Sequence, residues 1–267
     1  MSKPLFIIKL GGSVVTYKNY QFAKLRQKRL HEIAVEIKQA QNKIDFDLIL
    51  VTGAGSFGHP LAHKYQTQNG VYNQDQAHGF CEIKTLMNKM VSQIAQILNQ
   101  NGLSVFPCQT ASLIVQDKGK ISSFNTDPIK NLLKIGVIPF LSGDVSSDIT
   151  LGGSICSGDA IVPYLTKTFK VEKIFFASDV DGIFDKDPKK NKTAQVIPII
   201  NSKNFSELIN QIGTSNNTDV TDGMKGKILK YKEEVNQTPA FVFNGLKKQS
   251  VFNAILGKQK GTILDLV

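Results

Sequence analysis

Short apolar runs that stop at glycines, separated by helical patterns, constrain the fold of this chain more than any other feature. The run Leu5–Leu10 (LFIIKL) has the pattern of a buried strand and is followed at once by Gly11 and Gly12. A helical pattern over residues 24–40 comes next, and then the strand Leu48–Val51, which again ends in a glycine-rich segment. Strands that alternate with helices build βαβ units, so the pattern predicts an α/β fold around a largely parallel sheet.

The rest of the chain continues this alternation. Apolar runs predict further strands at residues 103–107, 137–141, 173–178, 239–244 and 260–265, and helical spacing predicts helices at 79–100, 158–168 and 224–236. A hairpin is expected over residues 113–122, and the glycine- and asparagine-rich segment 213–222 is expected to be a loop. Because no linker interrupts the chain, we expect a single domain over residues 1–267. Its N-terminal lobe would span about 1–165 and its C-terminal lobe about 166–267.

Composition excludes several classes of protein. Of the 267 residues, 41% are apolar and 20% are charged, which suits a folded core and excludes a disordered chain. The apolar runs are too short to cross a membrane, and the first residues lack a signal-peptide pattern, so a cytoplasmic protein without membrane partners is expected. Three scattered cysteines argue against a disulfide scaffold and against a cysteine zinc site. The net charge of +10 suits polyanionic partners, but no nucleic-acid-binding motif accompanies it, so nucleic acid is not expected.

The carboxyl ends of the expected strands carry most of the residues with useful chemistry. Ligands of parallel sheets bind at those ends. Glycines at Gly11–Gly12 and at Gly53–Gly58 let backbone N–H groups approach an anion, and the helix that follows adds a partial positive charge. Two such loops, with Lys9 beside the first, predict two phosphate-binding loops. Neither is a Walker motif, and the GxGxxG of the second lacks the acidic residue that a dinucleotide site needs.

Five motifs, taken in order, resemble those of the amino-acid kinase superfamily. They are Lys9–Ser13 (KLGGS), Gly53–His59 (GAGSFGH), Ser157–Asp159 (SGD), Ser178–Phe184 (SDVDGIF) with Asp187 and Pro188, and Asp222–Lys227 (DGMKGK). Within the superfamily, His59 and Lys18 resemble the isopentenyl phosphate kinases. The resemblance implies an open three-layer αβα sandwich around a largely parallel sheet. It also implies ATP-dependent phosphorylation of isopentenyl phosphate to the diphosphate, a step of isoprenoid biosynthesis.

Two alternatives stay open. Fosfomycin kinase shares the histidine, so a fosfomycin-type kinase or another kinase of small phosphates or phosphonates is the first alternative. A non-catalytic sensor or nucleic-acid-binding relative is a distant third reading. Such a protein would have no use for the complete set of charged residues retained here.

The resemblance further implies roles for single residues. Lys9 and Lys227 would contact the β- and γ-phosphates of ATP from two sides, and Asp159 would orient these lysines. Lys18 would stabilise the transition state, and His59 would hold the acceptor phosphate; these five form the expected catalytic set. The expected ATP-binding residues are Lys9, Gly11, Gly12, Ser13, Gly55, Asp179, Phe184, Gly223 and Lys227. The expected acceptor-binding residues are Ala54, Gly55, Gly58, His59 and Gly158.

Elementary chemistry agrees with such roles. A phosphate acceptor is already an anionic nucleophile, so the protein needs cations and N–H donors more than a general base. ATP and Mg²⁺ are the expected cofactors, with Mg²⁺ held mainly by the phosphates and by no dedicated protein site. The resemblance also implies a homodimer formed through the N-terminal lobe.

Three features leave questions for the structure. Ala54 and Asp222 stand where relatives often carry glycine, and Ala54 requires a negative φ to avoid strain. Lys225 could exchange roles with Lys227. On the helix expected over 79–100, one face carries apolar side chains that form either plain core or a wall for the acceptor's tail: Phe80, Ile83, Met87 and Met90.

Overall fold

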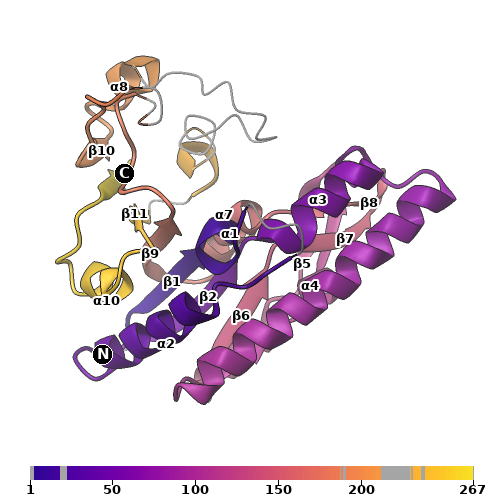
Figure 1. The fold of residues 1–267 in the computed structure, drawn as a ribbon, viewed down its shortest axis with the longest axis horizontal. Helices are drawn as coiled ribbons and strands as arrows, with labels where there is room; N and C mark the ends of the chain where they lie inside the picture. Colours follow the sequence, from indigo (N-terminus) through magenta and orange to yellow (C-terminus); the bar gives the residue numbers. More distant parts are fainter. Residues whose placement is uncertain are drawn as a thin grey trace.

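The strands of the molecule form two sheets. The computed structural model describes residues 3–18, 23–186, 188, 191–211, 229, 231–235 and 238–266. Over these residues, eight strands make one large sheet and four make a smaller one (Figure 1). The predicted helix 224–236 and the predicted loop 213–222 lie outside the described residues, apart from residues 229 and 231–235.

The larger sheet is centred on β1 (Leu5–Leu10), which lies between β2 (Asp47–Thr52) and β9 (Val171–Ser178) and runs parallel to both. The strands farther out are β6 (Ile138–Ser142) and β3 (Val105–Pro107) beyond β2, and β11 (Ala240–Asn244), β12 (Thr262–Asp265) and β10 (Ile199–Asn201) beyond β9. Among the described pairings of this sheet, the pairing of β11 with β12 is the antiparallel one. The largely parallel sheet is therefore confirmed.

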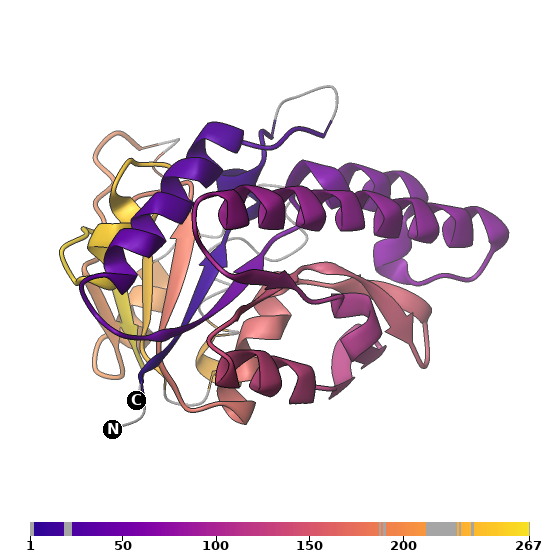
Figure 2. The same cartoon turned by 90° about the horizontal axis from the view of Figure 1, so that it is seen from below.

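Side chains of β1 alternate between two hydrophobic clusters. Phe6, Ile8 and Leu10 join the cluster that includes residues of α2 (Gln27–Gln41), α4 (Gln74–Gln100) and α10 (Ser250–Ile255). Leu5 and Ile7 join the cluster that includes residues of α6 (Asp127–Lys134) and α7 (Gly158–Thr168). Because neighbouring side chains of a strand point to opposite faces, these helices cover both faces of the sheet. Figure 2 shows α4 on one side of the sheet and α6 and α7 on the other. The predicted αβα sandwich is confirmed.

The other helices with described bounds are short, and two of them begin at glycines. They are α1 (Gly12–Val15), α3 (Gly55–Tyr65), η1 (Thr67–Asn69), α5 (Thr110–Leu113) and α8 (Phe205–Gln211). The helix expected over 79–100 begins earlier, because the side chain of Asn73 accepts a hydrogen bond of 2.9 Å from the backbone N–H of Gln76 and caps it. No helix in the described parts of the chain is both long and apolar enough to cross a membrane.

The smaller sheet was only partly predicted. Its hairpin, β4 (Ile114–Asp117) and β5 (Lys120–Phe124), agrees with the hairpin expected over 113–122. Two further strands, β7 (Asp144–Asp148) and β8 (Gly152–Cys156), complete it in the order β5-β4-β7-β8. Buried polar side chains hold these strands together: Ser146 and Ser154 both donate to the Gln116 side chain, at 2.7 and 3.0 Å.

Candidate functional site

Five chain segments meet at the carboxyl edge of the large sheet. Backbone hydrogen bonds extend the ladder one residue past the strands. Gly11 N–H donates to Ala177 O at 2.8 Å, and Gly53 N–H to Leu10 O at 3.0 Å. On either side, Gly143 N–H donates to Thr52 O and Gly245 N–H to Ser178 O, each at 2.7 Å. The loops after β1, β2, β6, β9 and β11 are therefore fixed side by side.

The two glycine loops touch through their backbones. A Cβ on Gly12 would lie 2.7 Å from both the N and the Cα of Gly55, and a Cβ on Gly53 would lie 2.9 Å from Gly12 N. Gly55 has φ +52°, and a side chain there would meet Thr16 Oγ1 at 2.3 Å. Only glycine allows two backbones to come this close. The first turns of α1 and α3, with their backbone N–H groups, therefore lie next to each other.

The second loop accommodates Ala54 without strain. Its φ is −68°, in the helical region, as the sequence required. Its methyl group faces Gly58, where a Cβ would lie 2.7 Å from that of Ala54. In the same turn, the buried Ser56 Oγ has no hydrogen-bond partner among the described residues. A buried hydroxyl is usually satisfied, so this atom is well suited to a polar ligand at the loop.

Lys9 and Asp159 form an ion pair at this edge. Lys9 lies near the end of β1, and its Nζ is 2.8 Å from Asp159 Oδ1 in the first turn of α7. The side chains are 11% and 29% exposed, so the pair is shielded but reachable. Ser157 caps α7 by accepting from Ala160 N–H, and Gly158 brings the helix start against Thr52 O, 3.0 Å from where a Cβ would stand. The N-terminal end of a helix favours the Asp159 carboxylate.

Lys18 and Asp179 form a second pair. Lys18, beyond α1, places its Nζ 2.9 Å from Asp179 Oδ2, just after β9. Burial alone would raise the pKa of the Asp179 carboxyl, but the hydrogen bond and charge of Lys18, the backbone N–H of Asp179 and the Ser13 hydroxyl lower that pKa below its ordinary value. The carboxylate is therefore ionised at neutral pH and ties the first glycine loop to the loop after β9.

Two further charged contacts at this edge were not predicted. Asp181 Oδ1 accepts from Asn244 Nδ2 at 2.9 Å and pairs with Lys247 Nζ at 2.6 Å, and these partners hold the pKa of Asp181 below its ordinary value. Beside β6, Lys84 Nζ of α4 lies 2.5 Å from Asp144 Oδ2; burial raises the pKa of Asp144, and Lys84 opposes that rise. The sequence held a clue to both contacts, because Ser142–Asp144 and Asn244–Gly245 also lie where a strand is followed by a glycine.

The other expected site residues are placed less closely together. His59 is exposed on α3, directly after Gly58. Phe184 is half-buried and forms an isolated bridge with Val196. Lys227 and Gly223, with their neighbours Asp222 and Lys225, lie outside the described residues, so their roles stay predictions.

The apolar stripe of α4 belongs mostly to the core. Ile83, Met87 and Met90 are buried, and both methionines are fully enclosed. Phe80 is half-buried, and its ring lies where a Cβ on Gly153 would come within 2.6 Å. Of the four side chains, Phe80 is thus the one with accessible surface beside the smaller sheet.

Comparison with known proteins adds the family. A model described as the amino acid kinase family matches residues 4–244. The isopentenyl phosphate kinase of Methanocaldococcus jannaschii is 37% identical over 272 residues, which cover 98% of this chain and 98% of that protein. The isopentenyl phosphate kinase of Methanothermobacter thermautotrophicus is 34% identical over 84% of each chain. A solved X-ray structure of isopentenyl phosphate kinase matches with a TM-score of 0.83 at 28% identity, covering 97% of this chain and 99% of its own.

Proposed function

This chain belongs to the amino acid kinase family and, within it, to the isopentenyl phosphate kinases, and from that premise we propose that it transfers the terminal phosphoryl group of ATP to isopentenyl phosphate. The product is isopentenyl diphosphate. The observation that carries the proposal is the meeting of two glycine loops with two lysine–aspartate pairs at one edge of the sheet.

The chemistry of this edge suits transfer between two phosphates. The transition state spreads negative charge over several oxygens, so catalysis depends on cations and fixed N–H donors. Lys9 and Lys18 supply the cations on β1 and beyond α1, and the starts of α1 and α3 supply the donors. No general base is needed, because the acceptor phosphate is itself the nucleophile.

We propose the following roles for individual residues. Lys9 contacts the β- and γ-phosphates, with Asp159 fixing its Nζ. Lys227, which lies outside the described residues, would approach these phosphates from the other side. Lys18 stabilises the transferring phosphoryl group after the lysine side chain has moved away from Asp179. His59 donates to the acceptor phosphate, close in sequence to the Ser56 hydroxyl, which has no hydrogen-bond partner among the described residues.

The two substrates divide between the lobes. In this proposal the acceptor is held by loops within residues 1–165, whereas ATP is held by loops within 166–267 together with the first glycine loop, Lys9 and Gly55. The nucleotide set comprises Lys9, Gly11, Gly12, Ser13, Gly55, Asp179, Phe184, Gly223 and Lys227. The acceptor set comprises Ala54, Gly55, Gly58, His59 and Gly158.

Mg²⁺ fits the charges of this site. Over the described residues, no group of three or more His, Cys, Asp and Glu side chains is arranged to hold a metal ion, so the ATP phosphates would supply most of its ligands. Bound there, the ion would neutralise part of the phosphate charge. Among the described residues after β9, Asp179 and Asp181 both have a pKa below its ordinary value, so both carboxylates are ionised on the side that we propose for the nucleotide.

Assembly and location are proposed more simply. We propose a homodimer formed through the N-terminal lobe, where the edge strand β3 exposes Phe106 to 52%. Cytoplasmic localisation stays a prediction from the sequence.

The test is a coupled assay of ADP release over isopentenyl phosphate, dimethylallyl phosphate, fosfomycin and acetylglutamate. We expect the highest kcat/KM with isopentenyl phosphate and a loss of turnover in Lys9→Met. The matched control is Lys3→Met, since Lys3 pairs with Asp45 at the surface, with both side chains more than half exposed. A preference for fosfomycin, or equal activity in Lys9→Met, would overturn the proposal.

A further inference from the structure

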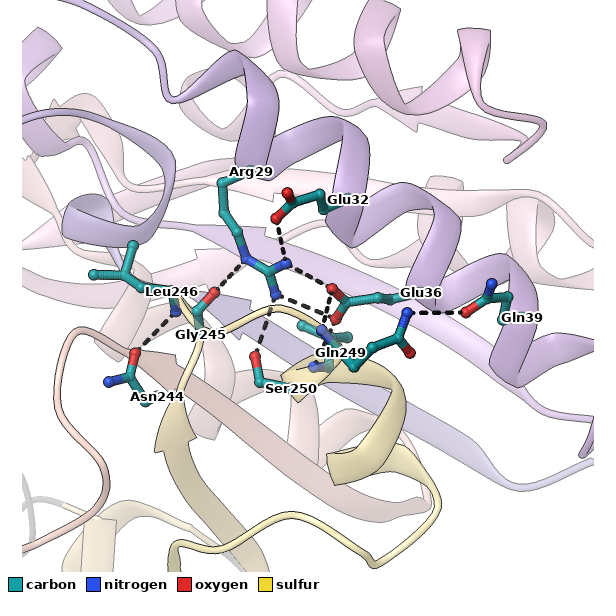
Figure 3. Close-up of polar contacts among 10 residues, drawn as sticks. Arg29, Glu32, Glu36, Gln39, Asn244, Gly245, Leu246, Gln249 and Ser250 are labelled. Atoms are coloured by element: carbon teal, nitrogen blue, oxygen red, sulfur yellow. Dashed lines mark hydrogen bonds and ion pairs between the residues drawn. The ribbon is translucent and has the colours of Figure 1, made fainter.

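A buried ion pair lies outside the site and links α2 to the chain segment that follows β11. Arg29 and Glu36 lie two turns apart on α2, and their side chains are 7% and 1% exposed. Figure 3 shows them facing Gly245, Gln249 and Ser250. Burying two charges is costly unless their hydrogen bonds are satisfied, so the partners of this pair are informative.

All five N–H donors of Arg29 have acceptors. Nε donates to Gly245 O at 2.7 Å. One terminal nitrogen donates to Glu36 Oε1 at 2.6 Å and to Glu32 at 3.1 Å. The other donates to Glu36 Oε2 and to Ser250 Oγ, both at 3.2 Å. Lysine, with three donors on one atom, cannot reproduce this planar arrangement.

Glu36 acts as the cap of a helix from another part of the chain. Its two oxygens accept from the backbone N–H groups of Gln249 at 2.9 Å and Val251 at 2.8 Å, where α10 begins. The N-cap residue of α10, Gln249, does not cap the helix with its own side chain. Its φ is +63°, which is unfavourable for a residue with a side chain. Residues 244–251 are therefore held in their conformation by α2.

The segment so held contacts the loop after β9. Asn244 and Lys247 both bind Asp181, and Gly245 N–H donates to Ser178 O. Gly245 also packs tightly, since a Cβ there would lie 2.7 Å from that of Ala177. Every link from Arg29 to Asp181 is thus a direct contact.

The beginning of α2 holds the first glycine loop as well. Arg26 Nε donates to Ser13 O and to Thr16 O, each at 3.0 Å, and so binds the carbonyl groups of α1. One helix therefore contacts both the loop after β1 and, through Arg29 and Glu36, the segment that supports the loop after β9.

We propose that Arg29 and Glu36 are positioning residues for ATP. They fix residues 244–251, and through Asn244 and Lys247 the Asp181 loop, at a set distance from the first glycine loop. The inference rests on the proposed function in placing ATP between these loops. It assigns the pair to affinity for the nucleotide and not to general stability.

The double variant Arg29→Met/Glu36→Leu distinguishes a role in nucleotide affinity from a role in general stability. Replacing both members of a buried ion pair by apolar side chains leaves no unpaired buried charge, whereas the contacts to residues 245–251 are lost. Titration of the full chain with Mg–ATP, without acceptor, is expected to show Kd raised by about fivefold or more, with KM for isopentenyl phosphate within about twofold of the wild type. Arg29→Lys should move Kd in the same direction and serves as the second variant if the double variant does not fold.

Val251→Ala is the matched control. It removes a fully buried side chain of α10 but keeps the backbone N–H that Glu36 accepts, so thermal stability should fall while Kd for ATP is retained. Wild-type Kd in a folded Arg29 variant, or an equal rise in the control, overturns the inference. Failure of the wild type to bind ATP would instead refute the proposed function.

Discussion

Gly12→Ala tests the contact between the two glycine loops. The new Cβ would lie 2.7 Å from Gly55 N and Cα, whereas ordinary contacts begin near 3.4 Å, so the two backbones must separate by about 0.7 Å. Gly55 cannot yield easily, because it already lies close to Thr16 and has φ +52°. We therefore expect the added methyl group to push the starts of α1 and α3 apart.

The magnitude follows from this overlap. Overpacking of a tight contact costs about 1–3 kcal/mol, and each kcal/mol lowers Tm by about 2–4 °C in a chain of this size. A displacement approaching 1 Å at reacting groups lowers activity by about 100-fold. The loss of kcat/KM should therefore be larger than the loss of activity expected from the small decrease in stability alone.

The assay compares kcat/KM and Tm with those of Gly136→Ala. Gly136 has φ +71° and open space around its Cβ position, so alanine there adds backbone strain of about 1–2 kcal/mol without touching the site. We expect similar losses of Tm in the two variants but reduced activity only in Gly12→Ala. Wild-type activity in a folded Gly12→Ala would refute the contact between the loops as a requirement for catalysis.

Three further predictions concern other parts of the molecule. His59→Ala should lower kcat/KM by about 100-fold or more and leave KM for ATP unchanged; an equal loss of ATP affinity would place the residue on the nucleotide side. Burial alone would raise the pKa of Asp148, but hydrogen bonds from the backbone of Gly119, Leu151 and Lys118 and from the Ser154 hydroxyl lower it to about 2. The wild type should therefore lose on the order of 1–2 kcal/mol of stability as pH falls from about 4 to 2. Asp148→Asn should lack that loss in acid-unfolding curves, and parallel curves would contradict this prediction. Met87→Ala should cost about 2–5 kcal/mol without changing the preferred acceptor, whereas Phe80→Ala should raise relative activity on geranyl phosphate; no change with Phe80→Ala would make the stripe plain core.

The elements that could be predicted have strong apolar patterns. The strand at Leu5–Leu10 and the helix over 158–168 were found at their observed bounds, because buried strands and amphipathic helices leave regular spacing in the sequence. By contrast, α3 contains two glycines and Pro60 within its first six residues, which local propensity disfavours as a helix. Its conformation depends on packing against α4 and the first loop, which no local pattern reveals.

Two strands of the smaller sheet, β7 and β8, were missed for a different reason. The sequences of β7 (DVSSD) and β8 (GGSIC) lack the apolar alternation of a strand. Buried hydrogen bonds hold them instead: Ser154 donates to Asp148 and Gln116, and the Asp148 carboxylate accepts from the backbone of Leu151. Such partners are identified only once the strands lie together.

The candidate site could be predicted in kind but not in its pairing. Glycines after strands predicted that these loops gather at one edge of the sheet, as the structure has them, because parallel strands end together. The partners of Lys18 and Asp181 come from segments that are distant in sequence, and spacing carries no information on such contacts. Arg29 and Glu36 likewise look like ordinary surface charges on α2, but in the structure they are buried and bind the segment after β11.

Phosphoryl transfer from ATP to a phosphate acceptor can be followed by ³¹P NMR of the reaction mixture. With ATP, Mg²⁺ and isopentenyl phosphate, we expect the single phosphomonoester signal to give way to the two coupled signals of a diphosphate ester while ADP accumulates. Lys9→Met should leave the monoester signal unchanged. ADP and inorganic phosphate appearing with the isopentenyl phosphate signal intact would contradict transfer to this acceptor.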